Sequence, residues 1–201
     1  NAVLLISMLF FSFTLFSQTD NGTASKFKFG FNMGVNYSNL QSQESLPSNA
    51  EISNGVGFNL GLFMDYSITE KFVVSPKAEL ALYNTSVDFT GTDNSNSSYE
   101  VFPYSLNFMT HFAYKIGTNK VVPYVFAGPN VKVPLDTKSE STTEFSTGTD
   151  FAIDFGIGFE NALKHFIFAP ELKYSIGMLD VNQNPGLQTL NFHTIGLILN
   201  F

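Results

Sequence analysis

Three histidines, ten lysines and 17 carboxylates are the side chains of this sequence that could move protons or carry charge. Histidine is the best suited of them to acid–base catalysis near neutral pH. A hydrolase site like that of the lipid A deacylases needs a serine two residues from a histidine. At that spacing the chain has only alanine or isoleucine, with Ala113 after His111, Ile167 after His165 and Ile195 after His193. This pattern excludes such a site.

Other reaction centres are also missing from the sequence. The chain has no cysteine, which excludes disulfides, thiol catalysis and thiolate metal sites. It has no glycine-rich phosphate loop, no histidine cluster with metal-ligand spacing and no nucleophile elbow. The paired acidic residues and His–Asp couple of an omptin-like protease do not occur at the required spacing either. We therefore predict no enzyme, no bound metal and no cofactor.

The composition points away from nucleic acids and towards a membrane. All ten basic residues are lysines and the net charge is −7, so nucleic-acid binding is not expected. Charged residues make up 13% of the chain, about half the usual ~25%. Beyond residue 17, no apolar run approaches the ~20 residues of a spanning helix. A chain too apolar for water and too interrupted for membrane helices is typical of transmembrane strands.

The N-terminal segment resembles an export signal. Residues 2–16 form an unbroken run of apolar and small residues, AVLLISMLFFSFTLF. Such a run has the length of a signal-peptide core and is short for a membrane span. We expect a signal peptide at 1–17 with cleavage before Gln18, a linker at 18–25 and a barrel domain at 26–201. The chain starts without methionine or a basic region, so we expect its true start to be missing.

From residue 26 onward, apolar and polar residues alternate with the period of a strand. Eight segments show this pattern: 26–37, 54–68, 72–85, 100–116, 121–133, 150–160, 166–178 and 189–201. The fifth is the least regular, because Pro123, Gly128 and Pro129 interrupt it. We expect a bulge that switches its parity near Gly128. The pattern predicts an eight-stranded antiparallel up-and-down β-barrel.

The connections alternate between short turns and long polar loops. Short turns follow the second, fourth and sixth segments, and loops of roughly 10 to 16 residues follow the others, as in outer-membrane barrels. Acidic residues gather in the long loops and lysines in the turns: Glu44, Glu51, Asp88, Asp93, Glu140, Glu144 and Asp180 against Lys71, Lys120 and Lys164. We expect long loops outside the cell and both termini in the periplasm.

Alternation alone does not tell which face meets the lipid, since a lipocalin-like barrel would turn its apolar face inward. The polar face is rich in Gly, Ala, Ser and Asn, which suits a narrow interior better than a water-facing surface. Aromatic residues gather at the strand ends, as membrane interfaces favour: Phe27, Tyr37, Tyr66, Phe102, Tyr114, Phe166 and Phe201. We therefore predict that the apolar face contacts lipid.

This orientation sends charged residues into the lumen. They are Lys28, Lys77, Lys115, Lys173, Asp65, Glu79, Asp154, Glu160 and Glu171. Six polar residues are expected at one depth, namely Lys77, Glu79, His111, Asp154, Glu171 and Lys173. Buried charges need partners and eight strands leave little space, so we favour a salt-bridged plug. The alternative is an ion path or proton-responsive cluster in which His111 titrates.

Three stretches resemble the PorT-type outer-membrane β-barrels of Bacteroidetes, which share the eight-stranded architecture of OmpA and OmpX. They are the stretch at 123–129 (PYVFAGP), the stretch at 171–177 (ELKYSIG) and the closing 196–201 (GLILNF). The resemblance covers residues 26–201 and implies the fold and the outer membrane. The last stretch, with Gly196, Leu197, Leu199 and Phe201, also resembles the signal that the outer-membrane assembly machinery reads. The family's namesake takes part in type IX secretion, so the resemblance implies a link to that pathway.

Three functions remain open at this point. The first is a non-enzymatic outer-membrane barrel that stabilises the envelope or binds a protein partner at its loops or periplasmic turns. The second is a narrow channel for ions or small solutes, and the third is an accessory role in type IX secretion. The expected surroundings in every case are outer-membrane lipid, lipopolysaccharide and the assembly machinery.

Overall fold

The computed structural model describes residues 26–42, 49–90, 96–100, 103–117, 120–135, 148–164, 166–181 and 189–201. The expected signal peptide (1–17) and linker (18–25) lie outside these ranges, as does Phe102. Among the described residues, no helix is long and apolar enough to cross a membrane.

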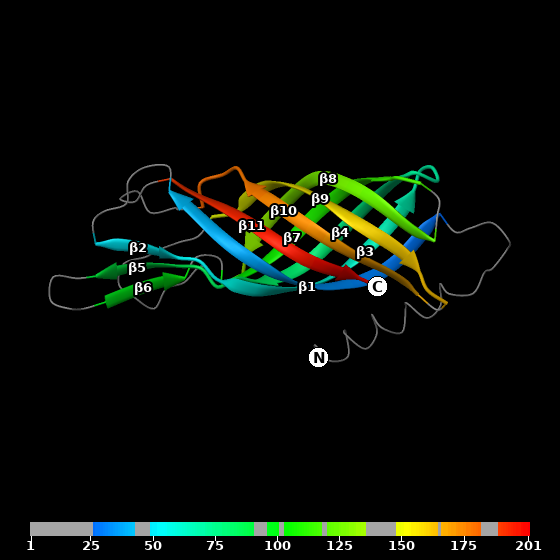
Figure 1. Ribbon diagram of the computed structural model, residues 1–201. Coiled ribbons are helices and arrows are strands. Elements are labelled where there is room, and N and C mark those ends of the chain that lie inside the picture. Colours follow the sequence, from blue (N-terminus) through cyan, green and yellow to red (C-terminus); the bar gives the residue numbers. More distant parts are fainter. Residues whose placement is uncertain are drawn as a thin grey trace, which may run out of the picture.

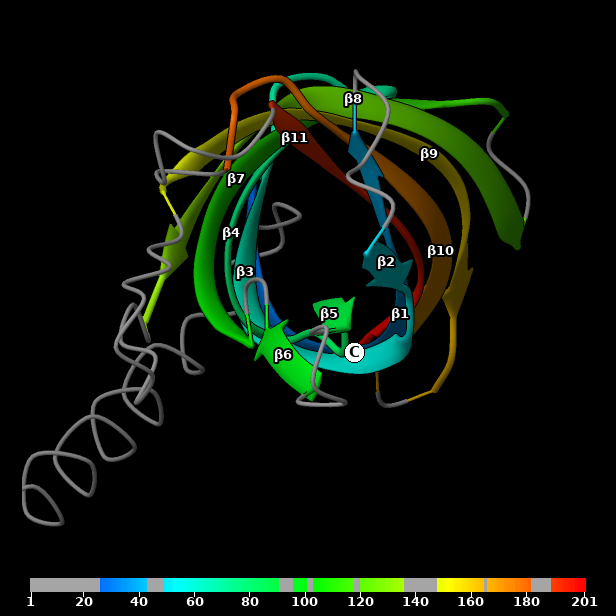
Figure 2. The same cartoon turned by 90° about the vertical axis from the view of Figure 1, so that its left-hand side faces the viewer.

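Eight strands close into one barrel within the described residues (Figures 1 and 2). They are β1 (Phe27–Ser42), β3 (Val56–Ser67), β4 (Phe72–Leu82), β7 (Tyr104–Lys115), β8 (Val121–Pro134), β9 (Asp150–Ala162), β10 (Ile167–Gly177) and β11 (Leu190–Asn200). Each pairs antiparallel with its neighbours, and β1 pairs with both β3 and β11, which closes the ring. The predicted eight-stranded antiparallel barrel is confirmed.

The two faces of the barrel differ sharply in chemistry. Outward side chains are large and apolar, and many are more than half exposed, such as Phe29 at 61% and Phe58 at 61%. Many inward side chains are small or polar, and Asn32, Glu79 and Asp154 are at most 1% exposed. The apolar outward surface is unfavourable in water and favourable in hydrocarbon. The apolar face therefore meets lipid, and the polar face fills the lumen.

The expected parity switch in β8 is wrong. The register of β8 against β9 runs without a break from Val121↔Asn161 to Lys132↔Asp150. Even-numbered residues of β8 point inward on both sides of Gly128. Pro129 fits because it lies on the outward face, where the strand continues despite the missing donor. Gly128 fits because a Cβ there would lie 1.8 Å from the carbonyl oxygen of Thr110.

Parts of two connections expected to be loops are strands. In the described residues, β2 (Ala50–Ser53), β5 (Ser86–Thr90) and β6 (Asn96–Glu100) form a three-stranded sheet in the order β2-β5-β6. They lie close in sequence to the outer ends of β3, β4 and β7, which neighbour one another in the same order. The sheet projects beyond the long-loop end of the barrel and stands in front of the ring of strands in Figure 2.

Candidate functional site

Two ion pairs cross the full width of the lumen. β4 and β10 lie four places apart in the ring of eight strands, on opposite walls. Lys77 on β4 donates to both carboxylate oxygens of Glu171 on β10, at 3.0 and 2.9 Å. Lys173 on β10 donates to Glu79 on β4 at 3.0 Å. The Lys-x-Glu of one wall therefore faces the Glu-x-Lys of the other, and the two pairs form crossbars between them.

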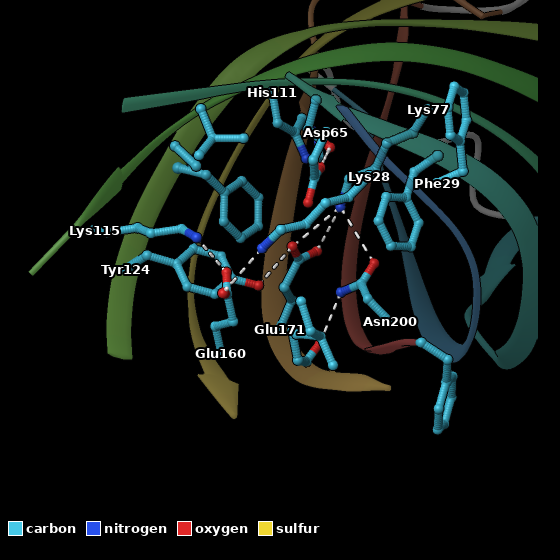
Figure 3. Close-up of a pocket in the computed structure, with 18 of the residues that line it drawn as sticks. Lys28, Phe29, Asp65, Lys77, His111, Lys115, Tyr124, Glu160, Glu171 and Asn200 are labelled. Carbon is cyan, nitrogen blue, oxygen red and sulfur yellow. Dashed lines mark hydrogen bonds and ion pairs between the residues drawn. The ribbon is translucent and has the colours of Figure 1, made fainter. Parts of the chain in front are cut away.

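Neutral side chains complete the coordination of the crossbar carboxylates. The amides of Asn32 and Asn59 donate to Glu79 at 3.1 and 3.2 Å. The hydroxyl of Tyr124 donates to Glu171 at 2.9 Å (Figure 3). Charges buried away from water are tolerated only with such partners. The crossbars thus have the coordination that a stable buried ion pair requires.

His111 and Asp154 form a third pair beside the crossbars. His111 Nε2 lies 3.1 Å from Asp154 Oδ2, and the amide of Asn130 donates to the same carboxylate at 3.0 Å. The imidazole stacks on the ring of Phe126, with centroids 4.7 Å apart. The six residues predicted to lie at one depth are all buried, and they make up three pairs. The pairs are Lys77–Glu171, Lys173–Glu79 and His111–Asp154.

A fourth ion pair lies in the lumen that the sequence pattern did not predict. Lys132 on β8 and Asp150 on β9 are register partners, their charged atoms lie 3.3 Å apart, and both side chains are at most 1% exposed. The Lys132 ammonium also lies over the ring of Phe192, 5.0 Å from its centroid. An unbroken parity along β8 would have placed Lys132 inward. The bulge expected at Gly128 concealed this signal.

The outer end of the bore is filled by an apolar cluster. Its buried members are Leu40, Ala81, Tyr83, Val87, Val181, Leu190 and Phe192, with Ala50 and Ile52 packed against them. They come from three barrel strands, from the projecting sheet and from the chain after β10. Tyr83 lies one residue beyond β4, and burial raises the pKa of its hydroxyl to about 12. That hydroxyl stays protonated and accepts a hydrogen bond from Asn107 at 3.0 Å.

The short-turn end of the bore holds a cavity of about 360 Å³ (Figure 3). Lys77 and Glu171 form its inner limit. At its mouth, Glu160 on β9 pairs with two lysines, Lys115 on β7 and Lys28 on β1, the latter at 3.6 Å. The bore therefore has three layers: an apolar cluster outside, ion pairs in the middle and this cavity on the short-turn side.

The closing stretch of the chain lies where β11 meets β1. Gly196 points inward, while Leu197 is 49% exposed on the outward face. The backbone of Phe201 exchanges two hydrogen bonds with Phe31, at 3.1 and 2.9 Å, and the two rings stack with centroids 5.2 Å apart. Leu199 pairs with Met33 in the same register. The residues that resemble an assembly signal thus form part of the seam that closes the barrel.

In the described part of the chain, no group of three or more histidine, aspartate or glutamate side chains is placed to hold a metal ion. Most charged side chains of the lumen instead pair with one another. Two of these pairs, the crossbars, join opposite walls of the barrel.

A family model described as "Outer membrane protein beta-barrel domain" matches residues 16–183. Among curated protein sequences, none matches the chain. The crystal structure of Neisserial surface protein A is similar in fold, with a TM-score of 0.53 and 13% identity over 88% of this chain and 98% of that one.

Two further crystal structures match at 16% identity. The outer membrane protein OprG from Pseudomonas aeruginosa has a TM-score of 0.47 and covers 87% of this chain and 94% of its own. The attachment invasion locus protein Ail of Yersinia pestis, in complex with the heparin analogue sucrose octasulfate, has a TM-score of 0.46 and covers 88% and 100%. These similarities concern the course of the chain.

Proposed function

The chain belongs to the outer membrane protein β-barrel domain family, and on that premise we propose that it is a closed, non-enzymatic barrel that anchors a partner-binding surface in the outer membrane. The family places the protein in the outer membrane, where its outward face contacts lipid. The observation that carries the proposal is the pair of crossbars, Lys77–Glu171 and Lys173–Glu79, which join opposite walls of the bore.

The crossbars support a closed lumen for a simple electrostatic reason. A conducting path needs charges that an ion can approach, whereas these four side chains are at most 7% exposed and already paired. An ion passing them would have to break a buried pair, which costs several kcal/mol. The apolar cluster at the outer end adds a second barrier, since apart from the Tyr83 hydroxyl its side chains offer an ion no polar partner.

The projecting sheet β2-β5-β6 supports a binding role. It projects beyond the barrel on the side of the long loops, where other molecules can reach it. Its exposed side chains include Glu51 and Glu100. An acidic surface of this kind favours a partner with a basic face, because complementary charge steers association.

A pull-down from detergent-solubilised outer membranes tests this role. We expect a stoichiometric protein partner whose recovery falls when Glu51 and Glu100 are both changed to glutamine. The matched control is Glu70→Gln, which removes a carboxylate at an exposed short turn on the opposite end. Recovery that is the same for all three forms, or no stoichiometric partner, would contradict a binding role for the sheet.

An accessory role in type IX secretion is the second candidate, favoured by the PorT-like stretches at 123–129 and 171–177. These stretches supply Tyr124, Glu171 and Lys173 to the lumen network. A deletion strain should then secrete less type IX cargo. Normal secretion by that strain removes this candidate and leaves the first one untouched.

A further inference from the structure

The cavity at the short-turn end is a chamber closed on its inner side. Part of its wall is apolar and aromatic, formed by Val73, Ala113, Tyr124, Phe126 and Ala169. The Lys77–Glu171 crossbar forms the inner limit (Figure 3). At about 360 Å³ the chamber falls at the small end of the range of ligand pockets. Since the short turns face the periplasm, a ligand would enter from that compartment.

One carboxylate of the chamber has no cationic partner. Asp65 accepts a hydrogen bond from the Ser75 hydroxyl at 2.6 Å, and within the described chain no lysine or histidine lies in ion-pair distance of it. Lys28 is its register partner across β1 and β3 and would be the obvious one. The Lys28 ammonium instead reaches away to Glu160 on β9. The half-buried Asp65 carboxylate therefore lines the chamber without an ion-pair partner.

The mouth of the chamber carries the opposite imbalance. Glu160 is shared by two ammonium groups, those of Lys28 and Lys115. One carboxylate neutralises only one of them, so the mouth has an excess of one positive charge. The chamber therefore presents three features. They are an unpaired negative charge at Asp65, a surplus positive charge at the mouth and an apolar part of the wall.

We propose that this chamber binds a small zwitterion with an apolar body, of the α-amino-acid class. The ligand's ammonium group pairs with Asp65, its carboxylate joins Lys28 and Lys115 at the mouth, and its apolar side chain packs on Val73, Ala113 and Phe126. The three parts of such a ligand match the three features of the chamber. A simple anion would leave Asp65 unpaired, and a simple cation would leave the mouth with its excess charge.

This site rests on the closed lumen proposed above, because an open bore would give the chamber no inner limit. The two can fail separately, since conductance measures closure and ligand titration measures the chamber.

Calorimetric titration of the purified, folded barrel in detergent micelles tests the proposal, with L-phenylalanine as the probe. We expect saturable one-to-one binding. Two analogues that each lack one charged group, 2-phenylethylamine and 3-phenylpropanoate, should bind about tenfold more weakly or worse. Empty micelles titrated with all three compounds correct for partition into detergent. No saturable binding of L-phenylalanine would overturn the proposal, and so would equally tight binding of either analogue.

Variants locate the site. Asp65→Asn should weaken the binding of L-phenylalanine by about tenfold, because it removes the charge that pairs with the ligand's ammonium group. Asp88→Asn, the same change in the projecting sheet, is the matched control and should bind like the wild type. A heat-dependent shift on a gel reports whether each variant has folded. If Asp65→Asn does not fold, Lys115→Gln against Lys71→Gln makes the same comparison at the mouth. Equal affinity of the variant and its control in the pair used would place the binding elsewhere and refute the assignment.

Discussion

At the scale of single residues, the crossbars are the buried ion pairs on which the proposed closed lumen rests. Lys77 and Glu171 are 3% and 7% exposed and belong to opposite walls. Their mutual attraction offsets the loss of hydration only while both are present. The same holds for Lys173 and Glu79, which are 6% and 1% exposed. Removing one of these side chains therefore destabilises the barrel mainly because its partner is left as an unpaired buried charge.

Glu171→Ala should lower the free energy of unfolding by about 3–5 kcal/mol, because it leaves the Lys77 ammonium buried without its carboxylate. Urea titration of the barrel in lipid vesicles measures this loss. The double variant Lys77→Ala/Glu171→Ala should lose less than the two single variants added together, since neither charge then remains. Glu70→Ala, an exposed carboxylate in a short turn, is the control and should lie near the wild type. A loss for Glu171→Ala no larger than that of the control would contradict the buried pair.

At the scale of elements, β8 depends on a glycine that allows a close strand approach. A Cβ at Gly128 would lie 1.8 Å from the Thr110 carbonyl oxygen on β7, whereas at Gly196 on β11 the nearest atom is 3.3 Å away. Gly128→Ala should therefore lower the free energy of unfolding by about 1–3 kcal/mol, as overpacking does. Gly196→Ala, the same change on another inward position, should cost clearly less. The same urea titration compares them, and equal losses would contradict the tight β7–β8 approach.

The last strand closes the barrel against β1. Phe201 joins β11 to β1 through its backbone and stacks on Phe31, with Phe168 also close by at 5.5 Å between centroids. Phe201→Ala should reduce the fraction of folded barrel in the outer membrane, because it removes the ring at the closing seam. Cell fractionation followed by a heat-shift gel measures that fraction. Phe151→Ala removes an outward ring far from the seam, and an equal defect in that control would refute a special role for Phe201.

The elements differ in how well the sequence predicts them, for physical reasons. Where one face meets lipid and the other a polar lumen, alternation is strong, so the barrel strands and their inward residues were predictable. The parity of β8 was predicted wrongly because proline and glycine usually interrupt strands. Here Pro129 lies on the outward face, and Gly128 lies against the backbone of Thr110 on β7. The projecting strands β2, β5 and β6 lie beyond the barrel, so the two-faced lipid pattern is absent and their polar residues resemble a loop. The long-range pairing of Lys77 with Glu171, 94 residues apart, depends on strand stagger that periodicity does not report.

At the scale of the whole molecule, the two ends of the barrel are unlike. One end carries the short turns and the cavity, and the other carries the projecting sheet. Outer-membrane barrels place short turns in the periplasm and long connections outside. The acidic carboxylates Glu51 and Glu100 then face the exterior.

Cysteine labelling on intact cells checks this orientation, and the cysteine-free chain gives a clean background. Thr90→Cys at the end of β5 should react with a membrane-impermeant maleimide on intact cells. Lys71→Cys, in the turn between β3 and β4, should react only after the cells are lysed. The reverse pattern, or labelling of both on intact cells, would show that the barrel is not oriented in this way.

Conductance of the purified barrel in a planar lipid bilayer tests the closed lumen most directly. The proposed closed lumen rests on the crossbars, the Lys132–Asp150 pair and the outer apolar cluster, which lie across the described part of the bore. We predict no steady single-channel current from the wild-type protein, with a porin in the same bilayer as positive control. Steady, reproducible single-channel currents from the wild-type barrel would contradict the account.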